Sequence, residues 1–341
     1  MSPQRKTTKS TKSTGSRRRR KKTPFRFTRQ NITKGSLAAL ALVFAYFFFQ
    51  PLLDRLAVDL KLTLGDAWVP PAATTPAEGT VRVHFIDVGQ ALCTLVQGSE
   101  KTALIDAGEA STAKDVVAYL KSQGVERIDY FFNTHPHADH MGGCRTVMES
   151  IPTSAFLQPN LPKKLVPTTV GYTKLLEYLT KNNKTIASQQ AAPGDVFDLG
   201  GGLTLSVLGP LKSYDDLNDQ SLVMRMDFGD TAFLFTGDTE APAQQDLYNA
   251  GMLHPVQVLG APHHGSSTSI DRDFMEAILP PGQSLLSVIS VGAGNDYGHP
   301  SPETLALYEQ LGITSYQTSL AGTVVITTDG ETLSVETSKG V

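Results

Sequence analysis

The distribution of hydrophobic residues divides the chain into one continuous apolar stretch and a long body of short alternating segments. Residues 35–53 carry no charged side chain and consist mainly of Leu, Ala and Phe. At about 1.5 Å rise per residue, a helix of this length crosses a hydrocarbon core of ~30 Å. We therefore predict an N-terminal transmembrane helix over residues 35–53.

The residues on either side of this stretch favour an uncleaved anchor. A signal peptide would be followed by a small-x-small cleavage site, and a buried core helix would show a polar face; the stretch has neither. Residues 1–34 hold thirteen Lys and Arg and no acidic residue. This predicts a disordered cytoplasmic tail and an extracytoplasmic body. Residues 54–80, which become rich in Pro and Ala, are expected to form a linker.

Short apolar runs separated by turn residues begin at residue 81 and continue to the C-terminus. Strands are expected over residues 81–88, 91–97, 102–105, 128–133, 203–208, 221–228, 231–235, 256–260, 286–291, 323–328 and 332–336. Helices are expected over residues 112–122, 169–181, 240–250, 271–279 and 302–311, with another beginning at residue 142. This order predicts an α+β domain over residues 81–341, in which two sheets pack face to face with helices outside.

The charge of the body restricts its partners. Residues 35–341 contain 17 basic and 33 acidic side chains, a net charge of −16. Proteins that grip nucleic acid rely on Lys and Arg to neutralise phosphates, so the body lacks a general electrostatic footprint for a long polyanion. A cytoplasmic nucleic-acid binder that uses the basic tail, with the apolar stretch buried, stays open as an alternative.

Two cysteines, Cys93 and Cys144, are the only ones in the sequence. They are too few for a disulfide framework and lack the spacing of a zinc knuckle. Two buried, unpaired thiols are therefore favoured over a single disulfide bridge.

Three of the eight histidines lie within six residues, at the end of a predicted strand. His135 and His137 alternate along an extended segment, so both side chains can face the same side. Asp139 and His140 follow as the chain turns. Imidazole nitrogens suit Zn²⁺, and a neighbouring carboxylate can bind a second cation. A polar loop with solvated histidines is the simpler alternative, but it does not account for this spacing.

Two later strand ends carry residues that a two-metal site still needs. Asp238 follows the strand predicted over residues 231–235, where its carboxylate could bridge two cations. His263 and His264 follow the strand predicted over residues 256–260. Each of these is an ordinary loop residue when taken alone. Their joint position at strand ends favours a metal site.

The order of these motifs resembles the metallo-β-lactamase superfamily. The motifs are Ile105-Asp-Ala-Gly, His135-x-His-x-Asp-His-x-Gly-Gly, Thr236-Gly-Asp and His263-His-Gly-Ser. Three more segments resemble the ComEC branch, the hydrolase domain of a DNA-uptake channel: Phe85-Ile-Asp-Val-Gly-Gln, Asn218-Asp-Gln-Ser-Leu-Val and Tyr297-Gly-His-Pro. The resemblance covers residues 81–336 and implies an αββα sandwich, with one predicted anchor in place of the channel.

The resemblance implies a centre of two zinc ions, with Mn²⁺ as an alternative. His135 and His137 would bind the first ion, and Asp139 and His140 the second. The second ion would also take one residue of the His263–His264 pair. We favour His264 as this ligand and His263 as a substrate or supporting contact. Asp238 would bridge the two ions.

Further residues receive expected roles from the same resemblance. Asp139 is expected to orient the attacking water or accept its proton, and Asp106 to orient a ligand histidine. His299 would contact a phosphate or protonate the leaving group, although a structural position at a helix start is an equal alternative. Residues expected to contact the substrate or support the ligands are Asp87, Gln90, Asn218 and Ser221.

The chain departs from the superfamily pattern in two places. Many two-zinc members carry a further histidine ligand before the Gly-Asp motif, but no histidine occurs between His140 and His254. We expect Asn218, Asp219 or solvent to fill that position. The loop after Gln90 reads Ala-Leu-Cys, where ComEC-like chains usually have Gly-Asp-Ala, so the substrate preference is expected to differ.

These features lead us to expect a dinuclear metallohydrolase that cleaves phosphodiester bonds outside the cytoplasmic membrane. DNA and a surface polymer are the candidate substrates. Alternatives are hydrolysis of a small phosphodiester, ester or lactone, and a non-catalytic zinc-containing surface module. The presence of both Asp139 and Asp238 favours catalysis. No feature predicts a protein partner.

Overall fold

The computed structural model describes residue 76 and residues 79–340. The predicted basic tail, the predicted anchor and most of the predicted linker lie outside these residues. In the described part of the chain, no helix combines the length and the apolar character needed to cross a membrane.

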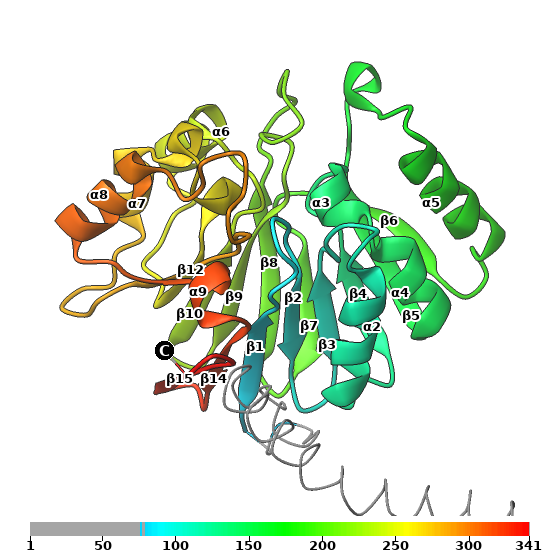
Figure 1. Cartoon of the computed structure of the whole chain (residues 1–341), viewed down its shortest axis with the longest axis horizontal. Coiled ribbons are helices and arrows are strands. Elements are labelled where there is room, and N and C mark those ends of the chain that lie inside the picture. Colours follow the sequence, from blue (N-terminus) through cyan, green and yellow to red (C-terminus); the bar gives the residue numbers. More distant parts are fainter. Residues whose placement is uncertain (1–75, 77–78, 341) are drawn as a thin grey trace, which may run out of the picture. The chain divides into compact units, whose positions relative to one another are not determined.

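Two β-sheets pack against each other in the middle of the domain (Figure 1). The first has the strand order β15-β14-β1-β2-β3-β4-β5-β6, and the second the order β13-β12-β11-β10-β9-β8-β7. The first sheet consists of β1 (Val81–Phe85), β2 (Thr94–Gln97), β3 (Thr102–Ile105), β4 (Ile128–Phe132), β5 (Thr153–Pro159), β6 (Ala187–Ala191), β14 (Val324–Thr328) and β15 (Leu333–Thr337). The second consists of β7 (Val196–Gly200), β8 (Leu203–Gly209), β9 (Val223–Phe228), β10 (Thr231–Phe235), β11 (Val258–Gly260), β12 (Leu286–Ile289) and β13 (Thr314–Gln317).

Each sheet combines an antiparallel half with a parallel half. In the first sheet, the pairs from β15 to β3 are antiparallel and those from β3 to β6 are parallel. In the second, the pairs from β7 to β10 are antiparallel and those from β10 to β13 are parallel. Since parallel strands carry their carboxyl ends at the same sheet edge, the loops after β3, β4, β10 and β11 can meet.

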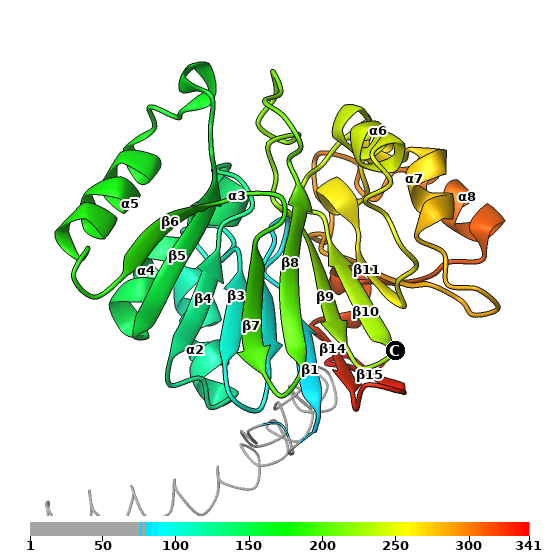
Figure 2. The same cartoon turned by 180° about the vertical axis from the view of Figure 1, so that it is seen from behind.

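Helices cover the outer face of each sheet, as Figure 2 shows from behind. The α-helices are α2 (Ala113–Ser122), α3 (Ala138–Met141), α4 (Cys144–Ser150), α5 (Val170–Lys181), α6 (Ala241–Asn249), α7 (Arg272–Ala277), α8 (Pro302–Leu311) and α9 (Thr318–Ala321). The short 3-10 helices are η1 (Lys163–Leu165), η2 (Pro262–Gly265) and η3 (Ser267–Ser269).

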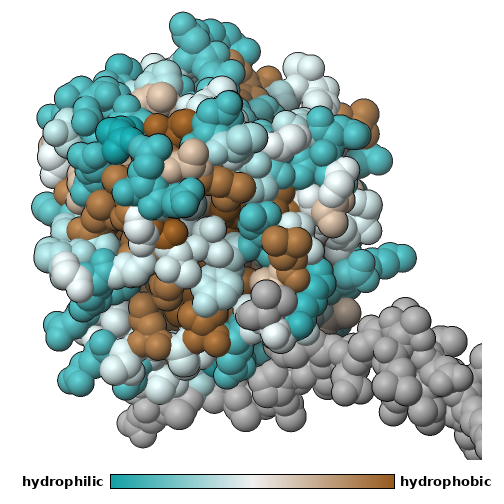
Figure 3. Space-filling model, turned by 60° about the vertical axis from the view of Figure 1, so that its left-hand side comes forward, coloured by the Kyte–Doolittle hydropathy of each residue, from teal (hydrophilic) through white to brown (hydrophobic). Residues whose placement is uncertain are grey.

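Three apolar clusters hold these layers together. The cluster between the sheets includes Val83 and Phe233. A second cluster, which includes Phe131, joins α2, α4 and α5 to the first sheet. A third, which includes Leu259 and Phe274, joins α6, α7 and α8 to the second sheet. On the face of the domain shown in Figure 3, hydrophobic patches alternate with hydrophilic side chains.

The structure confirms the α+β class and the two packed sheets. It adds four strands that the hydrophobic pattern left as loops, namely β5, β6, β7 and β13. Three of these, β6, β7 and β13, are edge strands. Their side chains are mostly exposed or half-buried, so they lack the apolar face that reveals a strand in sequence.

The two cysteines are free and buried, as predicted. Burial raises the pKa of the Cys93 and Cys144 thiols, which therefore stay protonated. Both side chains belong to the apolar cluster beneath α2 and α4.

Replacing Phe233 by Ala is expected to lower the free energy of unfolding by about 3–5 kcal/mol, because the side chain is fully buried between the sheets. Urea denaturation of the full chain measures this loss. Val196→Ala, at an exposed position of β7, is the control and should change the free energy by no more than ~0.5 kcal/mol. Equal losses in both variants would contradict the assigned core.

His84 makes the domain sensitive to acid. Burial, and after it the charge of Arg82, lowers the pKa of His84 from 6.5 to about 3. Between these values the unfolded chain takes up a proton that the folded chain does not. The free energy of unfolding should therefore fall below pH 6.5, by at most about 1.4 kcal/mol per pH unit from this residue. Urea denaturation at several pH values should show a shallower fall for His84→Gln, and an identical slope would refute the assignment.

Candidate metal centre

Three loops place their polar side chains together at one end of the sandwich. His135 and His137 follow β4, and Asp139 and His140 lie in α3. Asp238 follows β10, and the last contribution comes from η2, which follows β11. β3 and β4 are parallel in one sheet, and β10 and β11 are parallel in the other. The residues follow the carboxyl ends of neighbouring parallel strands, and for this reason they converge.

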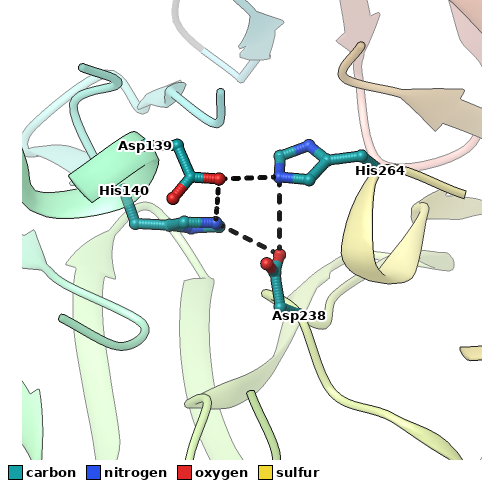
Figure 4. Close-up of side chains that lie close together, drawn as sticks. All are labelled: Asp139, His140, Asp238 and His264. Carbon is teal, nitrogen blue, oxygen red and sulfur yellow. Dashed lines mark ion pairs between the residues drawn. The ribbon is translucent and has the colours of Figure 1, made fainter. Parts of the chain in front are cut away.

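Asp139, His140, Asp238 and His264 form the first group of candidate ligands (Figure 4). The Nε2 atom of His140 lies 3.2 Å from Oδ1 of Asp238 and 3.6 Å from Oδ2 of Asp139. The Nε2 atom of His264 lies 3.3 Å from Oδ2 of Asp139 and 3.8 Å from Oδ1 of Asp238. Two imidazole nitrogens and two carboxylate oxygens thus face one common point.

His135, His137 and Asp238 form the second group. The Nε2 atom of His135 lies 2.8 Å from Nδ1 of His137 and 3.8 Å from Oδ2 of Asp238. In the first group it is the other oxygen, Oδ1, that faces His140 and His264. The two oxygens of Asp238 therefore face different groups, which is the arrangement needed for a carboxylate that bridges two cations.

Asp106 holds His140 from behind the cluster. Its Oδ2 accepts hydrogen bonds from Nδ1 of His140 at 2.8 Å and from Oγ1 of Thr134 at 2.6 Å. Its Oδ1 accepts from the Thr134 amide at 2.8 Å and from Nδ2 of Asn133 at 2.9 Å. The proton on Nδ1 leaves the Nε2 lone pair of His140 free for a cation. Asp106 thus lies where it can orient His140, and its role toward a metal stays a prediction.

His264 is fixed in the same way by the backbone. Its Nδ1 donates a hydrogen bond to the carbonyl oxygen of Ser290 at 2.7 Å. This bond directs the Nε2 atom toward Asp139 and Asp238. Of the two neighbouring histidines, His264 therefore belongs to the first group of candidate ligands. His263 instead faces the other carboxylate oxygen of Asp238, Oδ2.

Buried atoms without partners show that a cation fits this arrangement. Nε2 of His140, Nε2 of His264 and Oδ1 of Asp238 are all buried and lack a hydrogen-bond partner. Leaving such atoms unsatisfied costs free energy, and native proteins rarely do so. Imidazole nitrogen and carboxylate oxygen are suitable ligands for Zn²⁺ and Mn²⁺. A divalent cation would satisfy all three atoms at once.

The buried charges of the centre shift each other's pKa values. Burial opposes charge on every group, but Asp238 and Asp106 together raise the pKa of His140 well above its usual value. Burial also disfavours the Asp238 carboxylate, yet His140 and His264 hold its pKa well below the usual range. His135 differs, because burial and the neighbouring His140 lower its pKa. His135 therefore stays neutral and keeps a lone pair for a metal.

Glu240 supports His263, and sequence reasoning missed it. Its Oε1 lies 3.1 Å from Nδ1 of His263 and accepts hydrogen bonds from Thr268 at 2.8 Å and from Asn218 at 3.2 Å. The opposite nitrogen of His263, Nε2, lies 3.7 Å from Oδ2 of Asp238. The only sequence signal was an acidic residue two positions after the Gly-Asp motif.

The backbone is strained at the centre. Among the described residues, the non-glycine residues with positive φ are Asp106 at 57°, His263 at 48° and His264 at 55°. This left-handed conformation is uncommon outside glycine, although Asn, Asp and His adopt it more often than other residues, and it often occurs where function requires a particular side-chain direction. All three residues belong to the centre or support it.

The other predicted residues divide into near and remote ones. Ser221 lies beside the ligands, since its hydroxyl accepts a hydrogen bond from the Asp238 amide at 3.1 Å and lies 3.2 Å from Nδ1 of His135. Asn218 contacts Glu240, and its Oδ1 is buried without a partner. Asp87 instead contacts Thr323 and lies 3.7 Å from Lys339. Whether Asn218 replaces the absent histidine ligand stays a prediction.

Gln90 contacts the loop that ends at His299, next to the candidate ligands. Oε1 of Gln90 accepts a hydrogen bond from the amide of Gly292, at the start of the loop that ends at His299. The His299 ring lies 5.6 Å from the ring of His263 and 6.5 Å from that of His264, between centroids. Burial, His263 and His264 lower the pKa of His299, which favours its neutral form.

Solved structures with a similar fold include metallo-beta-lactamase fold proteins. YhfI from Bacillus subtilis is 14% identical, with a TM-score of 0.48 over 73% of this chain and 99% of that one. Zinc-bound PqqB from Methylobacterium extorquens is 10% identical, with a TM-score of 0.46 over 70% of this chain and 97% of that one.

Comparison of sequences gives relatives among competence proteins. Competence protein ComA from Neisseria gonorrhoeae is 30% identical over 258 residues, which is 74% of this chain and 33% of that protein. ComE operon protein 3 from Bacillus subtilis is 26% identical over 212 residues, 62% of this chain and 26% of that protein. The chain thus spans about a third or less of these relatives, and they confirm the ComEC-type resemblance.

A family model supplies the family assignment. The model described as the metallo-beta-lactamase superfamily matches residues 86–282, more than half of the chain. The matched segment contains the His135–His140 motif, Asp238 and the His263–His264 pair. The chain therefore belongs to the metallo-beta-lactamase superfamily.

Proposed function

We propose that this metallohydrolase cleaves phosphodiester bonds with two divalent cations, Zn²⁺ or Mn²⁺, outside the cytoplasmic membrane. The observation that carries the proposal is the position of Asp238, whose two oxygens face two separate groups of candidate ligands. We assign His135, His137 and Asp238 to one cation, and Asp139, His140, Asp238 and His264 to the other. Paired cations of this kind are typical of phosphodiester hydrolysis.

The cations, when bound, supply Lewis-acid chemistry: they activate a water molecule and stabilise negative charge on phosphoryl oxygens. The protein's own residues orient the reactants. The Asp139 side chain is 30% exposed, so it lies between the buried ligands and solvent. Burial opposes its charge, but the neighbouring His264, whose Nε2 lies 3.3 Å from Oδ2 of Asp139, lowers the pKa of Asp139 together with His140 and keeps the carboxylate ionised. Asp139 can therefore orient the attacking water and accept its proton.

His263 and His299 lie on the side of the centre where the substrate would enter. His263 is 20% exposed and is held by Glu240, so its ring is fixed but still reachable from solvent. We assign it a contact with the substrate phosphate. His299, whose ring adjoins that of His263, is assigned to the leaving-group side.

The extracytoplasmic location rests on the predicted anchor over residues 35–53 and the basic residues before it. The competence proteins among the relatives support a role at the cell envelope. The acidic body argues against gripping a long polyanion by charge, so a short or single-stranded diester suits it better than duplex DNA. A surface polymer with phosphodiester linkages is the other candidate.

Hydrolysis of bis-p-nitrophenyl phosphate, single-stranded DNA and RNA by the purified full chain tests this function. We expect activity with Zn²⁺ or Mn²⁺, and a loss of at least about 100-fold in Asp139→Ala and Asp238→Ala, since each removes a ligand group. Lys184→Ala changes an exposed residue in a turn, outside both groups of candidate ligands, and is the control. Inactivity of the metal-loaded wild type on all three substrates would sink the phosphodiester proposal. Full hydrolytic activity in both aspartate variants would overturn the assignment of Asp139 and Asp238 to the two ligand groups.

The supporting role of Asp106 can be tested without any substrate. Asp106→Asn keeps the shape of the side chain but weakens its bond to Nδ1 of His140. We expect the affinity for Zn²⁺ to fall about 10–100-fold, the usual cost of losing such a supporting carboxylate. Competition with a chelating indicator measures this affinity, and circular dichroism checks that the variant is folded. An unchanged affinity would show that Asp106 does not orient the ligand.

A further inference from the structure

Tyr297 is an exposed aromatic residue in a loop beside the metal centre. Its relative exposure is 73%, the highest among the large hydrophobic side chains exposed in the described part of the chain. An aromatic ring in water forfeits a large hydrophobic contribution to folding. Such exposure next to a candidate active site is therefore typical of a ligand contact.

The ring of Tyr297 is connected to the candidate ligands by stacking. It stacks on His299 with centroids 5.8 Å apart and an interplanar angle of 28°. His299 in turn stacks on His264 with centroids 6.5 Å apart and an angle of 19°. A group that lay against the free face of Tyr297 would thus be separated from the candidate ligand His264 by the rings of Tyr297 and His299.

The loop that carries Tyr297 is held in place by side-chain hydrogen bonds. Nδ2 of Asn295 donates to the carbonyl oxygens of Gly292 at 3.0 Å and His299 at 2.7 Å. Oδ1 of Asn295 accepts from the amides of Tyr297 at 3.2 Å and His299 at 3.1 Å. Gln90 fixes the start of the loop through Gly292. The exposed ring is therefore presented on an ordered support, which lowers the entropy cost of binding.

The shape of this surface favours a flat ligand. Quaternary ammonium groups are usually enclosed by cages of several aromatic rings, whereas Tyr297 offers a single open face backed by His299. A single aromatic face suits a nucleobase, because each of the bases can stack on it. In a duplex the base faces already stack on each other, so only an unpaired base is available.

We propose that Tyr297 is a stacking platform for a nucleobase next to the scissile phosphodiester, with Asn295 and Gln90 positioning its loop. This rests on the proposed function and deepens it. The substrate class becomes single-stranded nucleic acid or a nucleotide diester. Stacking does not depend on Lys and Arg, so it also explains how an acidic body can hold a nucleic-acid strand.

Three p-nitrophenyl phosphodiesters with the same leaving group test the platform in the metal-loaded full chain. Their second ester groups are thymidine, choline and methyl. For Tyr297→Ala we expect kcat/KM to fall at least about tenfold more on the thymidine ester than on the methyl ester, mainly through KM. Tyr297→Phe keeps the ring and should retain the thymidine preference. Tyr248→Ala removes another exposed tyrosine, in α6, and is the matched control.

Other outcomes would overturn the platform. Equal losses on all three esters would show a structural role, and a loss confined to the choline ester would show a cation site. Binding of fluorescein-labelled oligothymidylate, measured by anisotropy, gives a readout independent of catalysis. Tyr297→Ala should weaken this binding at least about tenfold. If the wild type cleaves no diester, the proposed function fails and binding alone tests the platform, which then fails if wild type and Tyr297→Ala bind oligothymidylate equally or if neither binds it.

Discussion

The carboxylate of Asp238 is shared between two groups of histidines, and the rest of the site is arranged around this position. One oxygen faces His140 and His264, and the other faces His135 and His263. Asp238 is buried, so its charge is costly unless cations or protonated imidazoles surround it. The histidines converge on it from both sheets, which makes the centre depend on how the sheets pack.

The supporting residues account for the direction of each candidate ligand. Asp106 fixes His140 from one sheet, and the backbone of Ser290 fixes His264 from the other. Both Asp106 and His264 adopt a left-handed backbone conformation, which the surrounding hydrogen bonds hold in place. This arrangement lowers the stability of the fold, because it directs lone pairs toward a point where no protein atom forms a hydrogen bond with them.

The surroundings of the centre differ in chemistry from its interior. The ligand groups are mostly buried, whereas Asp139, His263 and Tyr297 reach the surface. The net charge of the body is negative, so under the proposed function the positive charge of the cations and the aromatic face of Tyr297 would attract a phosphodiester with a base. The loop from Gly292 to His299 is tied to the segment after β1 by the hydrogen bond between the Gly292 amide and Gln90.

The sequence by itself determined the α+β class, the strands with apolar faces and the motif residues His135, His137, Asp139 and His140, because periodicity and spacing are local properties. The edge strands β6, β7 and β13 escaped it, since they are held by backbone pairing and not by buried side chains. Only the tertiary structure placed His264, and not His263, in a group of candidate ligands. It also revealed Glu240, because its partners His263, Asn218 and Thr268 lie in other segments of the chain and leave no local pattern in the sequence.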